Sequence, residues 1–172
     1  MILDLAKKRR SIRKFTGESV DKATVDEIIK IALLAPSSWG RHPVEFVIVE
    51  DKITIEKLAL CKRMGAGPLK DASVAIVVIV ERKNCELWIE DGAVASTYLL
   101  LAAEELGVGA CWIHMRGRAG QSGTAEEDIQ ELLGIPSNYG VLNVVALGHK
   151  GEFKPEISEK DLPFQNVHNG KF

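Results

Sequence analysis

The sequence carries its strongest fold signal in SVAIVVIV, residues 73–80. Residues 74–80 are all apolar and most are β-branched, which is the composition of a β-strand. A strand with one face in water alternates apolar with polar residues, and this one does not. The unbroken run therefore predicts a strand buried on both faces, in a central sheet that helices cover.

Three weaker strands are predicted at residues 44–50, 109–113 and 141–147, each a short apolar run with turn residues beside it. Helical segments separate the strands at uneven spacing. This alternation is too irregular to require a doubly wound parallel sheet. The pattern alone therefore predicts an α+β or α/β chain, and the length of 172 residues predicts a single domain over 1–172.

Helix starts are marked by capping patterns. Thr24 with Glu27 and Thr124 with Glu127 have the spacing of a capping box, and Asp51 is the expected N-cap of another helix. The expected helices cover residues 2–9, 24–35, 52–63, 86–106 and 124–133.

The helix expected at 86–106 is apolar around most of its circumference. Such a helix lies in the middle of a core or at a subunit interface. Asp91 interrupts its apolar surface, and we expect this carboxylate to reach solvent or to pair with a cation.

The composition of the chain narrows the classes of function that it can have. A net charge of −2 gives no overall attraction to nucleic acid, and no apolar run is long enough to span a membrane. Three cysteines without metal-site spacing predict reduced thiols in a cytoplasmic protein. The four histidines are scattered, so no metal site is expected.

A basic run, RRSIRKF, occupies residues 9–15. Guanidinium and hydroxyl groups bind phosphate oxygens, although a basic run near an N-terminus is more often a solvated face. The chain shows no nucleophile elbow, no phosphate-binding glycine motif and no conspicuous carboxylate pair. This combination suits an enzyme whose cofactor performs the chemistry.

Four motifs, in the same order, resemble the FMN-dependent nitroreductase family. They are the basic run 9–15, the Ala35–Ser38 segment, Pro43–Phe46 before a strand, and Trp88, Asp91 and Ala95 followed by residues 99–113. The resemblance covers most of the chain.

The resemblance implies an α+β sandwich with a mostly antiparallel central sheet. It also implies a homodimer with two FMN sites at its interface, shared between the subunits. The tail, residues 149–172, is expected to cross to the partner and to add a strand to its sheet. NADH or NADPH is the implied electron donor, and FMN carries the chemistry, so no protein side chain is assigned as catalytic.

The family's binding residues can be carried over by position. Arg9, Arg10 and Ser11 are expected to hold the FMN phosphate and ribityl chain, and Arg13 to lie near the pyrimidine edge and favour reduction. The remaining expected contacts are Pro36, Ser37 and Ser38 from the partner subunit, Gly40, the strand-end residues Trp112, Ile113, His114 and Met115, and Lys160 in the tail.

Three positions depart from the family pattern. Gly40 stands where relatives often have asparagine, Val44 where they often have tryptophan, and His114 where a glycine is common. His114 either projects over the flavin, where it contacts substrate, or is a solvent-facing loop residue. Trp39 and Arg41 are further candidates for contacting substrate.

The leading functional interpretation is an NAD(P)H-dependent oxidoreductase with ping-pong kinetics. The reduced flavin would pass electrons to a small electrophilic acceptor such as a nitroaromatic compound or a quinone. Two alternatives remain open: an FMN enzyme with specialised reductive chemistry on a small metabolite, and a flavin- or nucleotide-binding protein without turnover.

Overall fold

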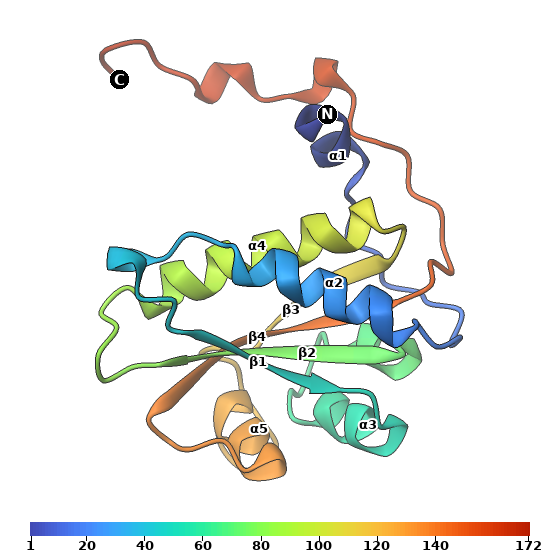
Figure 1. Ribbon diagram of the computed structural model, residues 1–172, viewed down its shortest axis with the longest axis vertical. Coiled ribbons are helices and arrows are strands. Elements are labelled where there is room, and N and C mark those ends of the chain that lie inside the picture. Colours follow the sequence, from blue (N-terminus) through green and yellow to red (C-terminus); the bar gives the residue numbers. More distant parts are fainter.

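The computed structural model describes all 172 residues, Met1–Phe172, as one sheet with helices on both of its faces (Figure 1). In chain order the elements are α1 (Ile2–Lys8), α2 (Lys22–Leu33), β1 (Val44–Val49), α3 (Lys52–Leu60), β2 (Val74–Glu81), α4 (Trp88–Glu105), β3 (Gly109–His114), α5 (Ala125–Leu133) and β4 (Tyr139–Gly148).

The sheet has the order β1-β2-β4-β3, and every neighbouring pair is antiparallel. Val77 in β2 lies opposite Val47 of β1 and Val144 of β4, so β2 and β4 are the central strands. This confirms the expected α+β class and the antiparallel sheet. It also shows why the most apolar stretch of the sequence had to be central.

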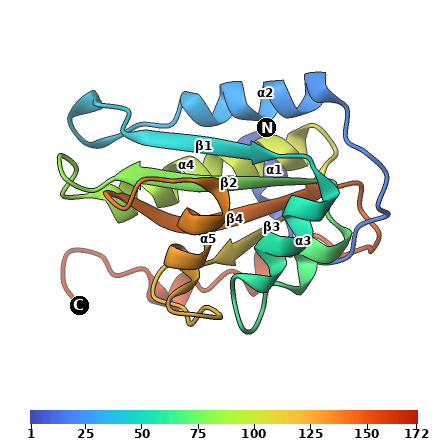
Figure 2. The same ribbon diagram turned by 90° about the horizontal axis from the view of Figure 1, so that it is seen from below.

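Two cores share β2. Val74, Ile76 and Val78 pack toward α2 and α4, whereas Ala75, Val77 and Ile79 pack toward α3 and α5. Figure 2 shows α3 and α5 in front of the sheet when the molecule is seen from below. Both faces of β2 are therefore buried, as its unbroken apolar run predicts.

The long helix α4 lies close against the sheet through Gly92. A Cβ at this position would come within 2.9 Å of Leu142 Cδ2 and 3.3 Å of Val80 Cγ2. The opposite side of α4 is uncovered: Val94 and Thr97 are exposed, and Leu101 is half-buried. The hydroxyl of Thr97 donates to the Ala93 carbonyl at 2.9 Å, which leaves this outer face largely apolar.

Helix termini mostly follow the sequence signals, with one correction. Thr124 and Glu127 form the expected capping box at α5. At α2 the N-cap is Asp21, which accepts from the Thr24 N–H at 2.9 Å, so Thr24 is not the cap. The Thr24–Glu27 capping box is therefore wrong, because Asp21 offers a carboxylate three residues earlier and Glu27 pairs with Lys30 instead.

The two ends of the chain stand away from the sandwich, on the side of α4 (Figure 1). Helix α1 has no buried residue, and Ile2 is 77% exposed. Beyond Gly148 the chain is extended, with only two short 3₁₀ turns. It returns alongside α1, where the Ile157 N–H donates to the Lys7 carbonyl at 2.9 Å. The structure contains no helix that could span a membrane.

Candidate active site

The basic segment, residues 9–13, follows α1 and lies against the edge of β3. Ser11 forms a parallel bridge with Ala110, and the Ile12 N–H donates to the Ala110 carbonyl at 2.9 Å. The Ile12 side chain is buried in the core at 3% exposure. Ile12 therefore fixes the segment in place, while the residues on either side of it remain at the surface.

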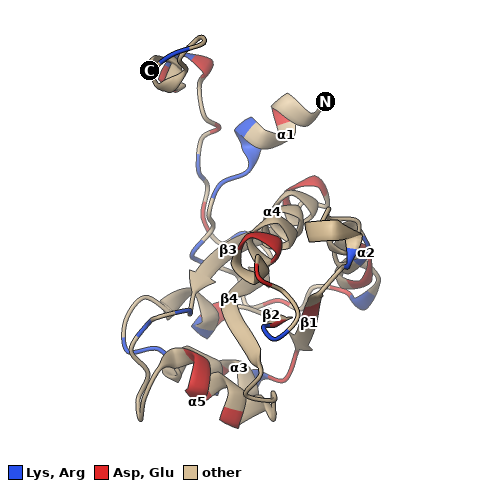
Figure 3. Ribbon diagram, turned by 90° about the vertical axis from the view of Figure 1, so that its left-hand side faces the viewer, with Lys and Arg blue, Asp and Glu red and all other residues tan.

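The three arginines of this segment have no carboxylate partner. The side chains of Arg9 and Arg13 form no hydrogen bond and no ion pair. The Arg10 guanidinium donates to the Pro155 carbonyl. At Arg13 only the backbone N–H is engaged, donating to Glu152 Oε1 at 2.6 Å. Figure 3 shows the resulting basic stretch at the end of α1.

The tail brings further cations to the same place. Lys154 Nζ donates to the Ser11 carbonyl at 2.6 Å and pairs with Glu152 at 3.3 Å. Lys160 is exposed and follows Glu159, which pairs with Lys7 of α1 at 3.2 Å. Sequence reasoning named Lys160 and missed Lys154, because nothing in a polar tail marks which lysine contacts a distant segment.

The second group of expected residues forms the serine loop, residues 36–42, between α2 and β1. The Ser38 N–H and hydroxyl both donate to Asp91 Oδ1 at 2.8 Å, and the His42 N–H donates to Ser37 Oγ at 2.8 Å. These bonds hold the loop at the N-terminal end of α4.

The serine loop has an unusual backbone. Trp39, Gly40 and His42 all have positive φ, at 57°, 63° and 48°. Such angles are uncommon for residues other than glycine and persist where the surroundings enforce them. A Cβ at Gly40 would meet nothing within 4 Å, so asparagine, which tolerates this conformation, would also fit there. Trp39 is 89% exposed.

The surroundings of Asp91 differ from those predicted. We expected a carboxylate that reaches solvent or pairs with a cation, but Asp91 is only 5% exposed and no cation pairs with it. Its other oxygen, Oδ2, accepts from Cys85 Sγ at 3.4 Å. Burial, followed by this hydrogen bond, raises the pKa of the Cys85 thiol. Asp91 is satisfied by neutral donors in the first turn of α4, where the helix dipole favours a negative charge.

The third group lies at the other end of β3. Trp112 and His114 are half-buried, with near-parallel rings whose centroids are 6.4 Å apart, while Ile113 and Met115 point into the core. His114 is a strand residue, opposite Asn143 of β4, so the loop alternative is wrong. Burial, then the charges of Arg118, Lys62 and Arg116, lower the pKa of His114.

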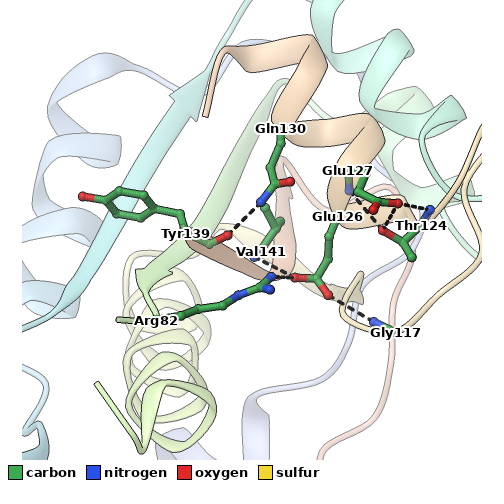
Figure 4. A network of polar contacts seen from close by, with 8 residues as sticks. All are labelled: Arg82, Gly117, Thr124, Glu126, Glu127, Gln130, Tyr139 and Val141. Carbon is green, nitrogen blue, oxygen red and sulfur yellow. Dashed lines mark hydrogen bonds and ion pairs between the residues drawn. The ribbon is translucent and has the colours of Figure 1, made fainter. Parts of the chain in front are cut away.

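The loop that follows β3 is fixed to α5 through Glu126. This half-buried carboxylate pairs with Arg82 and accepts from the Val141 N–H at 3.1 Å and the Gly117 N–H at 3.4 Å (Figure 4). The network holds residues 116–118 next to the end of β3.

One chain does not bring all the expected residues together. The basic segment lies near the C-terminal end of α4, where Glu104 pairs with Lys150, and the serine loop lies at Asp91 near its N-terminal end. These two positions of α4 are 13 residues apart, which corresponds to about 20 Å along a helix. The basic segment and the start of β3 are adjacent, and the serine loop is remote from the basic segment.

The chain is similar to known proteins over nearly its whole length. Residues 6–61 and 62–149 match the sequence model of the Nitroreductase family. An FMN-dependent nitroreductase from Clostridium difficile R20291 is 40% identical and has a TM-score of 0.96, with 99% of each chain covered.

Two further relatives are informative. A protein of Archaeoglobus fulgidus, named as a candidate NADH dehydrogenase/NAD(P)H nitroreductase, is 33% identical over 95% of this chain and 94% of its own. The crystal structure of a candidate nitroreductase from Desulfovibrio desulfuricans in complex with FMN is 25% identical, with a TM-score of 0.78, and the match covers 99% of this chain and 97% of that one.

Proposed function

Because the chain belongs to the nitroreductase family, it is an NAD(P)H-dependent oxidoreductase that uses FMN, and we propose that it reduces a small electrophilic acceptor in a homodimer with shared sites. Nitroaromatic compounds and quinones are the acceptor classes proposed. One observation carries this proposal: the basic segment is fixed beside β3, and its arginines have no carboxylate partner.

The residues of this segment fit the chemistry of FMN. A phosphate dianion needs several charged and neutral donors, and Arg9, Arg10 and Ser11 supply both kinds within three residues. Lys154 contacts Ser11 directly, and the tail places Lys160 near the same segment through the Glu159–Lys7 pair. We propose that these five residues hold the phosphate and the ribityl chain.

Arg13 and the end of β3 have a different proposed role. The guanidinium of Arg13 is free to stabilise negative charge on the pyrimidine side of the ring, which favours the reduced state. The segment Trp112–Met115, which continues along β3 from Ala110, would contact the ring with its backbone.

Bound FMN would supply the redox chemistry by accepting a hydride from NAD(P)H, which leaves as NAD(P)⁺, and then passing two electrons with a proton to the acceptor. The protein's own task is to bind and orient both reactants and to exclude water. Trp39 and Arg41, at the tip of the serine loop, and His114 are proposed to contact the acceptor.

The proposed dimer explains why the serine loop is far from the basic segment within one chain. If two copies pair their α4 helices antiparallel through the exposed apolar face, the N-terminal end of one α4 lies beside the C-terminal end of the other. Pro36, Ser37, Ser38 and Gly40 of one subunit would then complete the site of its partner. The tail is proposed to cross to the partner as well.

A complementation experiment tests the shared site. Arg9→Ala combined with Arg13→Ala removes the arginines, and Ser38→Ala combined with Asp91→Ala releases the serine loop. Each homodimer should lose FMN-dependent activity. Co-expression should restore part of it, because one of the two sites in a mixed dimer contains only wild-type residues. Mixed dimers, isolated with two different tags, that stay inactive would contradict shared sites.

A further inference from the structure

A cavity of ≈ 380 Å³ opens beside the end of β3, and none of the resemblance-based assignments except His114 uses it. Its walls come from the loop after α3, the last residue of β3 and the loop before α5. The lining residues, which define the cationic pocket, are Lys62, Arg63, Met64, His114, Arg118 and Ala119.

The cations of this pocket are not neutralised by the protein. Lys62 and Arg118 form no ion pair. Arg116, in the adjacent loop, lies over the Trp88 ring at 5.6 Å and is likewise free of a carboxylate partner. Arg63 donates from Nε to the Gly120 carbonyl at 2.7 Å, which ties the two loops together and fixes the shape of the pocket. Figure 3 shows the basic stretches of loop between β3 and α5.

The positive charges around the pocket disfavour the protonated forms of Lys62 and His114. Burial and then the charge of Arg118 lower the pKa of Lys62, and the pKa of His114 is lowered by burial and by the surrounding cations. Like charges that converge on one cavity raise the free energy of the empty state, and an anion in the cavity would relieve this repulsion.

The nearby carboxylates are already engaged. Glu126 raises the pKa of His114 slightly against the cations, but its oxygens are bound by Arg82 and two backbone amides (Figure 4). Asp128 accepts from Ser122 Oγ at 2.6 Å and from the Gln121 N–H at 2.5 Å. Neither acid lines the pocket.

The position of the pocket indicates what would bind there. His114 is four residues from Ala110 along β3, about 13 Å in a strand, so the pocket is at the opposite end from the segment proposed to hold the cofactor's phosphate. Met64 and the adjacent Trp112 provide apolar surface for a flat molecule.

We propose that the cationic pocket binds the anionic group of a planar electron acceptor, a carboxylate or a sulfonate, while the rest of the acceptor lies at the end of β3. This inference rests on the proposed function. It adds a preference for anionic over neutral acceptors, with Lys62 and Arg118 as the specificity-determining residues.

The test compares two matched acceptors, 4-nitrobenzoate and 4-nitrobenzamide, with the FMN-loaded protein. The ratio of their kcat/KM values should favour the benzoate at low ionic strength and fall as salt is added. Lys62→Gln and Arg118→Gln should each lower the ratio roughly threefold, and the double variant roughly tenfold. Lys22→Gln, on α2 and paired with Asp26, is the matched control and should keep the wild-type ratio.

Two outcomes would overturn the assignment. One is a ratio that does not change in either variant. The other is that the substitutions lower kcat/KM for NADPH but not for NADH and leave the ratio of the two acceptors unchanged. That result would place the 2′-phosphate of NADPH in the pocket instead.

A binding measurement separates this proposal from the proposed function. Calorimetric titration with benzoate and benzamide requires no turnover, and benzoate should bind more tightly in a manner that depends on Lys62 and Arg118. Preferential benzoate binding without flavin reduction by NAD(P)H would support the pocket and contradict the proposed function. Normal flavin reduction with equal binding of the two ligands would contradict the pocket alone.

Discussion

At the scale of single residues, Asp91 connects the fold to the site, because its two oxygens hold Ser38 and Cys85. Asp91→Ala leaves two donors of the half-buried Ser38 unpaired, so the free energy of unfolding should fall by about 2 kcal/mol. The released serine loop should also weaken FMN binding. Urea unfolding and FMN titration measure the two effects.

Two variants complete this test of Asp91. Asp91→Asn keeps a neutral acceptor and should lose less, whereas Glu90→Ala, in the same first turn of α4, should behave as wild type. Asp91→Ala with wild-type stability and FMN affinity would show that the two hydrogen bonds from Ser38 do not hold the serine loop.

Arg13 is predicted to tune the flavin. Arg13→Ala should weaken FMN binding roughly tenfold, because a charge-assisted contact contributes about 1.5–3 kcal/mol. It should also lower the two-electron reduction potential by roughly 20–30 mV, since 30 mV corresponds to about 1.4 kcal/mol. Lys14→Ala, the exposed neighbouring cation, is the control. Equal potentials for the two variants would show that Arg13 is not near the ring.

His114 gives a pH dependence with a defined sign. Its pKa is lowered in the folded protein, so below the ordinary value of 6.5 the unfolded chain binds a proton more readily than the folded one. His114 should therefore cost no stability at pH 7.5, and the protein should lose stability as the pH falls from 6.5 to the lowered pKa.

Two measurements check this prediction. An NMR titration of His114 should give a pKa below 6.5, and Arg118→Gln should raise it. Unfolding at pH 7.5 and pH 5.5 should show a smaller drop in His114→Gln than in the wild type. A drop of the same size in both proteins would contradict the assignment.

At the scale of elements, the outer face of α4 is the proposed dimer contact. Thr97→Arg places a charge in the middle of this apolar face and should convert the dimer to a monomer that has lost FMN affinity, as light scattering and FMN titration would show. Glu56→Arg, on the exposed side of α3 beneath the sheet, should remain dimeric. A dimeric, FMN-binding Thr97→Arg protein would rule out this face.

The helices and strands were largely predictable from local sequence, whereas the order in which the strands pair in the sheet was not. Residues 73–80 identify a central strand because burial on both faces forces an unbroken apolar run. The order β1-β2-β4-β3 depends on contacts between residues far apart in the chain, which no local pattern encodes. Asp21 was missed as an N-cap because Thr24 and Glu27 fit the capping-box spacing equally well.

At the scale of the whole molecule, the candidate site was predictable only in part. The basic segment and the β3 end were found through a resemblance, and the structure places the basic segment beside the start of the same strand. The roles of Asp91, Lys154 and Lys62 could not be read from the sequence, since each depends on a contact with a residue more than 50 positions away. The serine loop is far from the basic segment in one chain, and only a second copy would unite them.

The central claim is that this chain binds FMN and that a nicotinamide donor reduces it. The most direct measurement is anaerobic stopped-flow mixing of the FMN-loaded protein with NADH and, separately, with NADPH, followed by a second mixing with a quinone. We predict that at least one donor rapidly abolishes the flavin absorbance near 450 nm and that the quinone restores it. A protein that takes up no FMN, or whose bound FMN keeps its absorbance with both donors, would contradict the account.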